Sequence, residues 1–122
     1  MDRNIDGPAH VISAANAEHY EWGQKCDGWH LVAAADLSVI EERMPSGTFE
    51  TRHHHVRSRQ FFYVLEGELI MEVEYHEYTV RAGQGIEVAP GQKHQAMNRS
   101  DRPARMIVVS QPPSHGDRVE AR

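Results

Sequence analysis

Three consecutive histidines, His53, His54 and His55, are the residues of this chain best suited to chemistry. In a β-strand, residues two positions apart point to the same side. The imidazoles of His53 and His55 can therefore converge on one ion, while His54 points the other way. Neutral imidazole is a ligand for zinc, copper, iron and nickel. The run indicates part of a metal site, provided that it lies in a strand.

Two further side chains can complete such a site. Gln60 follows His55 by five residues, which is enough to round a short turn and return on the next strand. His94 follows the Pro90-Gly91 turn and begins another strand-like segment, so its ring can enter from the opposite wall. An isolated His-X-His pair on a strand usually binds nothing. The agreement between the histidines, the turns and the strand pattern is what favours a site.

The elements that must position these residues have the periodicity of strands. Glycine and proline turns separate short segments in which apolar and polar residues alternate, and only residues 13–18 suggest a helical turn. The predicted strands are Leu31–Ala34, Leu37–Met44, Gln60–Leu65, Glu68–Tyr75, Tyr78–Val80, Ile86–Val88, His94–Asn98 and Ala104–Ser110. Short strands at this spacing predict a closed all-β fold.

The composition is that of an ordinary globular protein of 122 residues, with 39% hydrophobic and 25% charged residues. The formal net charge of -5 argues against a nucleic-acid partner, because binding phosphates requires a basic face. No apolar run approaches the ~20 residues that a membrane span needs. The single cysteine, Cys26, is compatible with a reducing compartment. We therefore expect a cytoplasmic protein without a membrane partner.

We divide the chain into three parts. Residues 1–28 are expected to be an N-terminal arm that packs on the body or on a partner chain, because a disordered tail would seldom carry Trp22. Residues 29–111 are the predicted barrel. Residues 112–122 are a C-terminal tail that is either wrapped or disordered, because Pro112 and Pro113 cannot continue a sheet.

Two motifs make the chain resemble the cupins, a family of RmlC-like jelly-roll barrels, or double-stranded β-helices. The first family motif is a glycine, His-X-His, a glutamate and a second glycine. The matching residues here are Gly47, His53, His55, Gln60 and Gly67. The second motif is a glycine, Pro-X-Gly, a histidine and an asparagine. The matching residues are Gly83, Ala89, Gly91, His94 and Asn98. Gln60 and Ala89 depart from the pattern.

The resemblance implies that His53, His55, Gln60 and His94 ligate one divalent transition metal inside the barrel. Because Gln60 replaces a glutamate, all four ligands are neutral and the full +2 charge of the ion stays uncompensated. Such a set disfavours Mn²⁺, favours Zn, Fe, Ni or Cu, and should draw an anionic ligand to the open positions. The rival interpretation is that the loss of glutamate marks a barrel that no longer binds metal.

Two functions remain open on this resemblance. One is an enzyme, dioxygenase-like or isomerase-like, acting on a small oxygenated or anionic metabolite. The other is a non-catalytic module that binds a sugar or an organic acid. No catalytic base can be named from the sequence, and Glu42, Arg43, Arg52 and Arg57 are only candidates for contacting a substrate. Small cupins commonly pair through their sheets, so we expect a homodimer.

Overall fold

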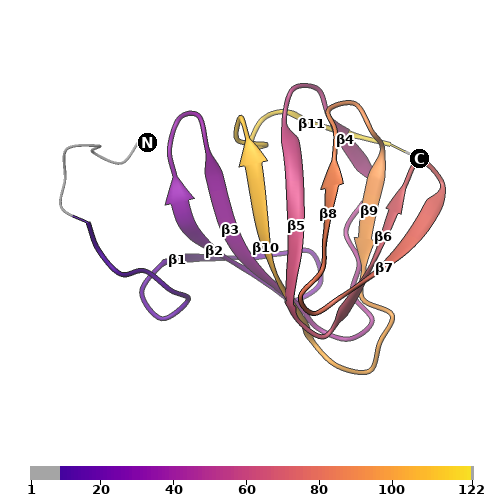
Figure 1. Cartoon of the computed structure of the whole chain (residues 1–122), viewed down its shortest axis with the longest axis horizontal. Helices are drawn as coiled ribbons and strands as arrows, with labels where there is room; N and C mark the ends of the chain where they lie inside the picture. Colours follow the sequence, from indigo (N-terminus) through magenta and orange to yellow (C-terminus); the bar gives the residue numbers. More distant parts are fainter. Residues whose placement is uncertain (1–8, 122) are drawn as a thin grey trace.

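The computed structural model describes residues 9–121, which form eleven β-strands and no helix (Figure 1). The strands are β1 Glu18–Trp22, β2 Cys26–Ala33, β3 Ser38–Met44, β4 His53–His55, β5 Arg59–Glu66, β6 Glu68–Val73, β7 His76–Arg81, β8 Gly85–Val88, β9 His94–Met97, β10 Ala104–Gln111 and β11 Arg118–Glu120. The described part of the chain therefore offers no helix that could cross a membrane.

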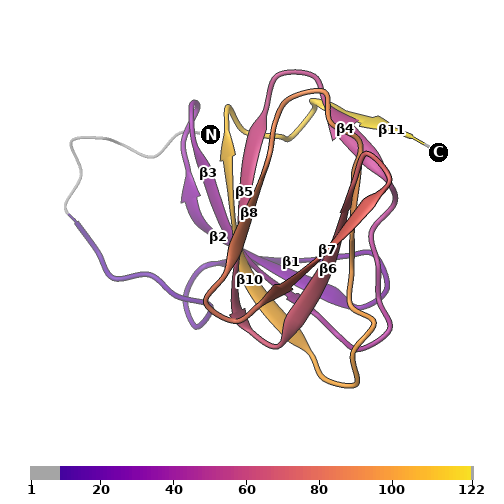
Figure 2. The ribbon, with the colours of Figure 1, turned by 45° about the vertical axis from the view of Figure 1, so that its right-hand side comes forward.

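The strands form two antiparallel sheets that face each other, as Figure 2 shows. One sheet has six strands in the order β1-β2-β3-β10-β5-β8, and the other has five in the order β11-β4-β9-β6-β7. Neighbours that are far apart in sequence, such as β3 beside β10, are typical of the jelly roll. The predicted all-β double-stranded β-helix is confirmed.

Alternation along the strands places the core between the sheets. In β10, Ala104, Met106 and Val108 are buried, and the residues between them are only half-buried. Leu69 and Met71 of β6 meet them from the opposite sheet as fully buried side chains. Burying such a side chain stabilises the fold by roughly 2 kcal/mol. The core thus follows from the period of two in the sequence.

The first two strands differ from the prediction. β2 begins at Cys26 instead of Leu31, and β1 was not predicted at all. Tyr20 of β1 pairs with Gly28 of β2, where an added Cβ would lie 2.3 Å from the tyrosine ring. Glycine at this position therefore lets the Tyr20 ring lie directly over the backbone of β2. Residues 1–8, the beginning of the expected arm, lie outside the described residues.

The β6–β7 hairpin turns one step earlier than the sequence pattern indicated. Glu74 and Tyr75 occupy the turn with φ angles of 48° and 71°, as a two-residue hairpin of this kind requires. β6 ends at Val73 and Tyr75 is 77% exposed, so the predicted end of this strand at Tyr75 was wrong. His76, expected in the turn, is the first residue of β7.

The chain beyond the two prolines returns to the five-stranded sheet. β10 ends at Gln111, as Pro112 requires, and β11 then pairs with β4. In this pairing Arg118 lies opposite His55, and Glu120 lies opposite His53. The last described strand therefore flanks the strand that carries the predicted metal ligands.

Candidate metal centre

The structure brings the three predicted histidine ligands together. His53 and His55 lie on β4, and His94 of β9 is the direct partner of His53 in the sheet. Their available ligand atoms all lie within 4.8 Å of one another. The three rings are 1–4% exposed, whereas His54 points away and is only half-buried. Strand parity thus separates the members of the histidine run as expected.

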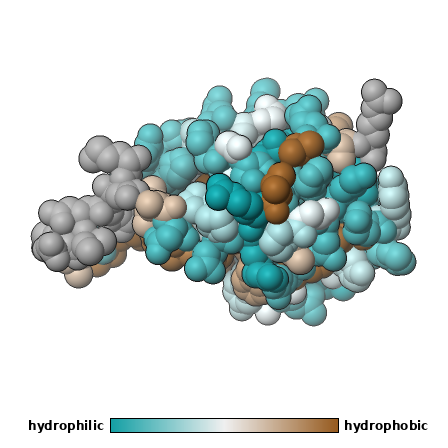
Figure 3. Space-filling view, turned by 90° about the horizontal axis from the view of Figure 1, so that it is seen from above, coloured by the Kyte–Doolittle hydropathy of each residue, from teal (hydrophilic) through white to brown (hydrophobic). Residues whose placement is uncertain are grey.

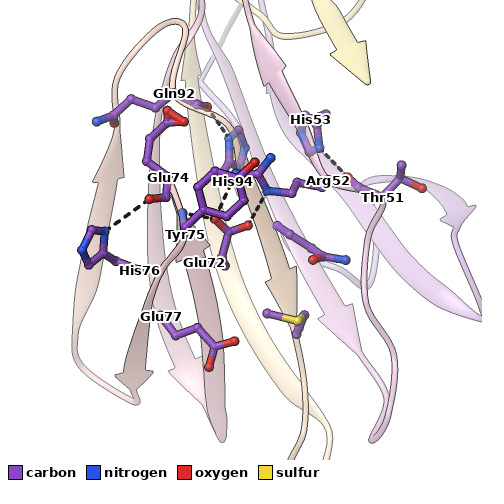
Figure 4. Close-up of polar contacts among 12 residues, drawn as sticks. Thr51, Arg52, His53, Glu72, Glu74, Tyr75, His76, Glu77, Gln92 and His94 are labelled. Atoms are coloured by element: carbon purple, nitrogen blue, oxygen red, sulfur yellow. Dashed lines mark hydrogen bonds and ion pairs between the residues drawn. The ribbon is translucent and has the colours of Figure 1, made fainter. Parts of the chain in front are cut away.

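Backbone carbonyls hold two of the rings in place. The Nδ1 of His53 lies 2.7 Å from the carbonyl oxygen of Thr51, and the Nδ1 of His94 lies 3.0 Å from that of Gln92 (Figure 4). If Nδ1–H donates in each case, Nε2 keeps a free lone pair. Metal-binding histidines usually have such an outer partner. Within residues 9–121, the buried Nε2 of His94 has no hydrogen-bond partner, which fits a metal-ligand atom.

The same signature occurs at Gln60 on β5. Its side chain is 6% exposed, and its Nε2 donates a hydrogen bond to Ser110 Oγ at 3.0 Å. This contact orients the amide and leaves Oε1, which is buried and has no partner among the described residues. An unsatisfied buried carbonyl oxygen costs about 1–3 kcal/mol. A bound cation would remove that cost, so the donor set fits a metal.

Burial keeps the histidines neutral. Burial, with a smaller contribution from the neighbouring His94, lowers the pKa of His53 to about 3 and that of His55 to about 4. The pKa of His94 is lowered for the same main reason. All three rings are therefore uncharged near pH 7, which is the form that binds metals.

A cavity of about 250 Å³ opens beside His53, His55 and Gln60. Phe62 and Ile40 form part of its wall, as inward-facing residues of the six-stranded sheet. The surface seen from above in Figure 3 is mainly hydrophilic, and hydrophobic residues appear there only in small areas. Apolar walls with a few convergent polar groups are typical of a small-molecule site.

Two carboxyl groups face this cavity. Burial and the nearby Glu50 raise the pKa of Glu42 to about 8, and burial raises that of Glu50 to about 7. The backbone N–H of Ala96 donates to Glu50 Oε1 at 2.9 Å and fixes its position. No motif or strand period in the sequence singles out Glu50. Glu42, a candidate for contacting a substrate from the sequence, occupies an inward position between Ile40 and Met44 and lines the cavity.

The arginines considered from the sequence do not line the cavity. Arg52 forms an ion pair with Glu72, and Arg43 faces Asp27 on the outer side of the sheet. Arg118 and His115 of the C-terminal segment line it instead. Neither was predicted, because their approach depends on the pairing of β11 with β4.

Comparison with known proteins identifies the family. The model of the cupin domain matches residues 40–110, so the chain belongs to the cupins. An uncharacterized protein, MJ1618, of Methanocaldococcus jannaschii is 31% identical over 81 residues, which is 66% of this chain and 65% of that protein. The chain thus spans slightly less than two thirds of this relative.

Solved structures share the fold. A cupin from Silicibacter pomeroyi described as a sugar phosphate isomerase superposes with a TM-score of 0.73 at 22% identity, over 85% of this chain and 76% of that one. Streptomyces PAC13 with uridine, a protein described as a nucleoside dehydratase, gives 0.78 at 16% identity, over 95% and 93%. At these identities the likeness concerns the fold alone.

Proposed function

We propose that this cupin is an enzyme that binds one divalent transition metal through His53, His55, His94 and the amide oxygen of Gln60. The observation that carries the proposal is the convergence of three buried, neutral histidines, with ligand atoms within 4.8 Å of one another. The unpartnered Gln60 oxygen adds a fourth donor. A bound ion would polarise an oxygen of the substrate as a Lewis acid.

The charges around the site favour a substrate with anionic or enolic oxygens. All four proposed ligands are neutral, so they do not offset the charge of the ion. Arg118 lines the same cavity and adds a further positive group. Nitrogen-rich ligation suits Zn²⁺, Fe²⁺, Ni²⁺ or Cu²⁺ better than Mn²⁺. A small oxygenated metabolite is therefore the expected substrate.

Among the open reaction classes, the carboxyl groups favour isomerase-like chemistry over oxygen chemistry. Glu42 and Glu50 have pKa values of about 8 and about 7, so each can hold or release a proton near neutral pH. General acid–base catalysis is most effective when the pKa lies near the working pH. In this proposal one carboxyl removes a proton next to the polarised oxygen, and the other returns a proton.

The alternative is a cupin that binds a sugar or organic acid without turning it over. The same cavity would serve, but the two protonatable carboxyls would then have no task. An isomerase exchanges a substrate C–H with solvent, so deuterium from D₂O should appear in a bound substrate. A binder would be stabilised by the ligand without any such exchange.

The metal site can be tested by elemental analysis of untagged protein that has not touched nickel resin. We expect near one equivalent of one metal in the parent and in His54→Ala, whose side chain points away. The His53→Ala/His94→Ala variant should retain none while keeping its β-sheet circular dichroism. An empty parent that also fails to take up Fe²⁺, Zn²⁺ or Ni²⁺ would contradict the proposal.

Changing Gln60→Glu tests the fourth ligand separately. A carboxylate would supply the hard anionic oxygen that Mn²⁺ prefers, so we expect the affinity for Mn²⁺ to rise by roughly tenfold or more relative to Zn²⁺. Competition titrations on the metal-free protein would measure the ratio. An unchanged preference would mean that residue 60 does not contact the ion.

A further inference from the structure

A second chamber adjoins the cavity at the histidines. Its volume is about 670 Å³, and it shares four wall residues with the first cavity: Tyr20, Ile40, Ser114 and His115. The rest of its wall comes from Glu18 of β1, from His30 and the turn end of the β2–β3 hairpin, and from Pro113 after β10. The volume lies in the range of roughly 300–1,000 Å³ that is usual for sites of drug-sized ligands.

Small side chains create this hollow. Ala33, Ala34 and Ser38 line it where β2 turns into β3, and none of them reaches far across the interior. Ile40, two residues further along the same face of β3, is the first large side chain. The small side chains of the hairpin therefore leave this space open. It adjoins the wall residues that both chambers share.

Aromatic rings and apolar side chains form much of the wall of the second chamber. The rings of Tyr20 and His30 lie 4.9 Å apart and are tilted by 32°. Ile40 and Pro113 add apolar surface. Aromatic side chains prefer stacked or tilted ring partners at such distances. The chamber thus complements a planar ring better than a flexible polyol.

The charges of the second chamber disfavour a phosphate group on the part of the ligand that lies in it. Glu18 is the one acidic residue of its lining, and no lysine or arginine of the described chain lines it. A phosphate there would face a carboxylate without a guanidinium or ammonium partner. The cationic and metal-binding groups belong to the first cavity, where Arg118 lies.

From this arrangement we infer that the two chambers form one substrate site for an aromatic or conjugated cyclic compound with an oxygen-bearing head. The head, a carboxylate or enol, lies at the histidines. The ring system lies in the second chamber, against the wall formed by Tyr20, His30 and Pro113. The inference rests on the proposed metal site and specifies the substrate class for it.

A matched pair of metal-binding probes tests this inference. Acetohydroxamic acid reaches a metal but carries no ring, whereas 2-naphthohydroxamic acid carries the same head and two fused rings. On the Zn²⁺-loaded full chain, calorimetric titration should show that the naphthyl compound binds tighter by roughly tenfold or more. Binding of acetohydroxamic acid itself reports that the metal is present and accessible.

Filling the chamber should remove this advantage. Ala33→Leu and Ser38→Leu place bulk in the hollow from β2 and from β3, and neither residue belongs to the hydrophobic core. In both variants the ratio of the affinities for the naphthyl and the acetyl compound should fall to near one. The affinity for acetohydroxamic acid should stay that of the parent. Ala35→Leu, on the same hairpin but outside the lining, is the matched control and should keep the preference.

The outcomes separate the two proposals. Equal affinities of both probes for the parent, or a preference that survives both chamber-filling variants, would overturn the ring-binding role of the chamber and leave the metal site intact. A parent that takes up no Zn²⁺ and binds neither probe would overturn the metal-dependent function, and the inference with it.

Discussion

Glu42 is the residue whose protonation the structure changes most among the carboxyls of the cavity. Its pKa of about 8 results from burial and from the nearby Glu50, and burial likewise raises the pKa of Glu50. Tyr20 of β1 and Cys26 of β2 also face Glu42, and the charge of Glu42 contributes to raising the pKa of both. Arg118 of β11 opposes these effects at Glu50. At neutral pH the cavity thus holds protons that solvent-exposed carboxyls would have lost.

This protonation predicts how the stability of the metal-free protein depends on pH. The pKa of Glu42 is raised in the folded state, so its contribution to the free energy of unfolding is fully present below about 4.5 and is lost as pH rises towards about 8. Glu42→Gln cannot ionise. Relative to the parent, its free energy of unfolding should therefore increase between pH 5 and pH 8, by about 3 kcal/mol.

Urea unfolding of EDTA-treated protein at both pH values measures this difference. Glu41→Gln, on the outer side of the same strand, is the control and should follow the parent. If Glu42→Gln shows the same dependence on pH as the parent, the carboxyl is ionised in the folded protein near neutral pH.

The clustering of the three histidines could be predicted from the sequence, whereas their surroundings could not. His53, His55 and His94 follow from strand parity and from the position of a turn. Glu50 lies in a segment between β3 and β4 that has no strand period, so nothing in its neighbours indicates which way it points. Its approach to the cavity depends on the hydrogen bond to Ala96 of β9, which is 46 residues away.

Strands β4 and β6 are tied together by one ion pair next to the metal centre. Arg52 immediately precedes β4, and its Nε lies 2.6 Å from Glu72 Oε1 of β6 (Figure 4). The guanidinium lies over the Tyr75 ring at 4.3 Å, and the Tyr75 N–H donates to Glu72. Both charged side chains are only 10% exposed. The pair therefore fixes the backbone from which His53 projects.

Replacing Arg52→Met should destabilise the protein strongly. The change leaves the buried Glu72 carboxylate without its counter-charge, and breaking such a pair costs about 3 kcal/mol. Urea unfolding at pH 7 measures the loss. The double variant Arg52→Met/Glu72→Gln should recover part of it, because no buried charge then remains unpaired. A double variant that loses as much as the sum of the two single variants would show that the residues are not coupled.

The strands themselves were predictable where apolar residues alternate without interruption. β5 and β10 follow this rule, and their bounds were found within one or two residues. β1 and the first half of β2 were missed because Gly23 and Gly28 interrupt the alternation. Their pairing is set by the fit of Tyr20 against Gly28, which no local pattern reveals.

The outer face of the six-stranded sheet is the surface on which we expect two copies of the chain to pair. Phe61, Tyr63 and Leu65 of β5 are 38–46% exposed there. Val109 and Ile107 of β10 lie beside Phe61 and Tyr63 in the sheet register, with their side chains half-buried. Contiguous apolar surface of this kind commonly marks a protein interface.

We therefore predict that the protein is a homodimer. Light scattering at a concentration of about 50 µM, a level at which interfaces of ordinary strength are formed, should give twice the mass of one chain. Phe61→Glu/Ile107→Glu should shift the protein to a monomer without loss of its sheet structure. Val56→Glu, at an exposed position in the β4–β5 turn, is the control. A parent that is monomeric at this concentration would contradict the prediction.

The position of β4 between β9 and β11 has a consequence for synthesis on the ribosome. The strand that carries His53 and His55 is translated well before either neighbour, since β9 begins at His94 and β11 at Arg118. A growing chain therefore displays a two-histidine pair before the third ligand exists. Completion of the three-histidine centre must follow translation of β9, and its enclosure must follow translation of β11. An ion that needs all three histidines, as proposed here, could therefore bind only late in the maturation of this protein.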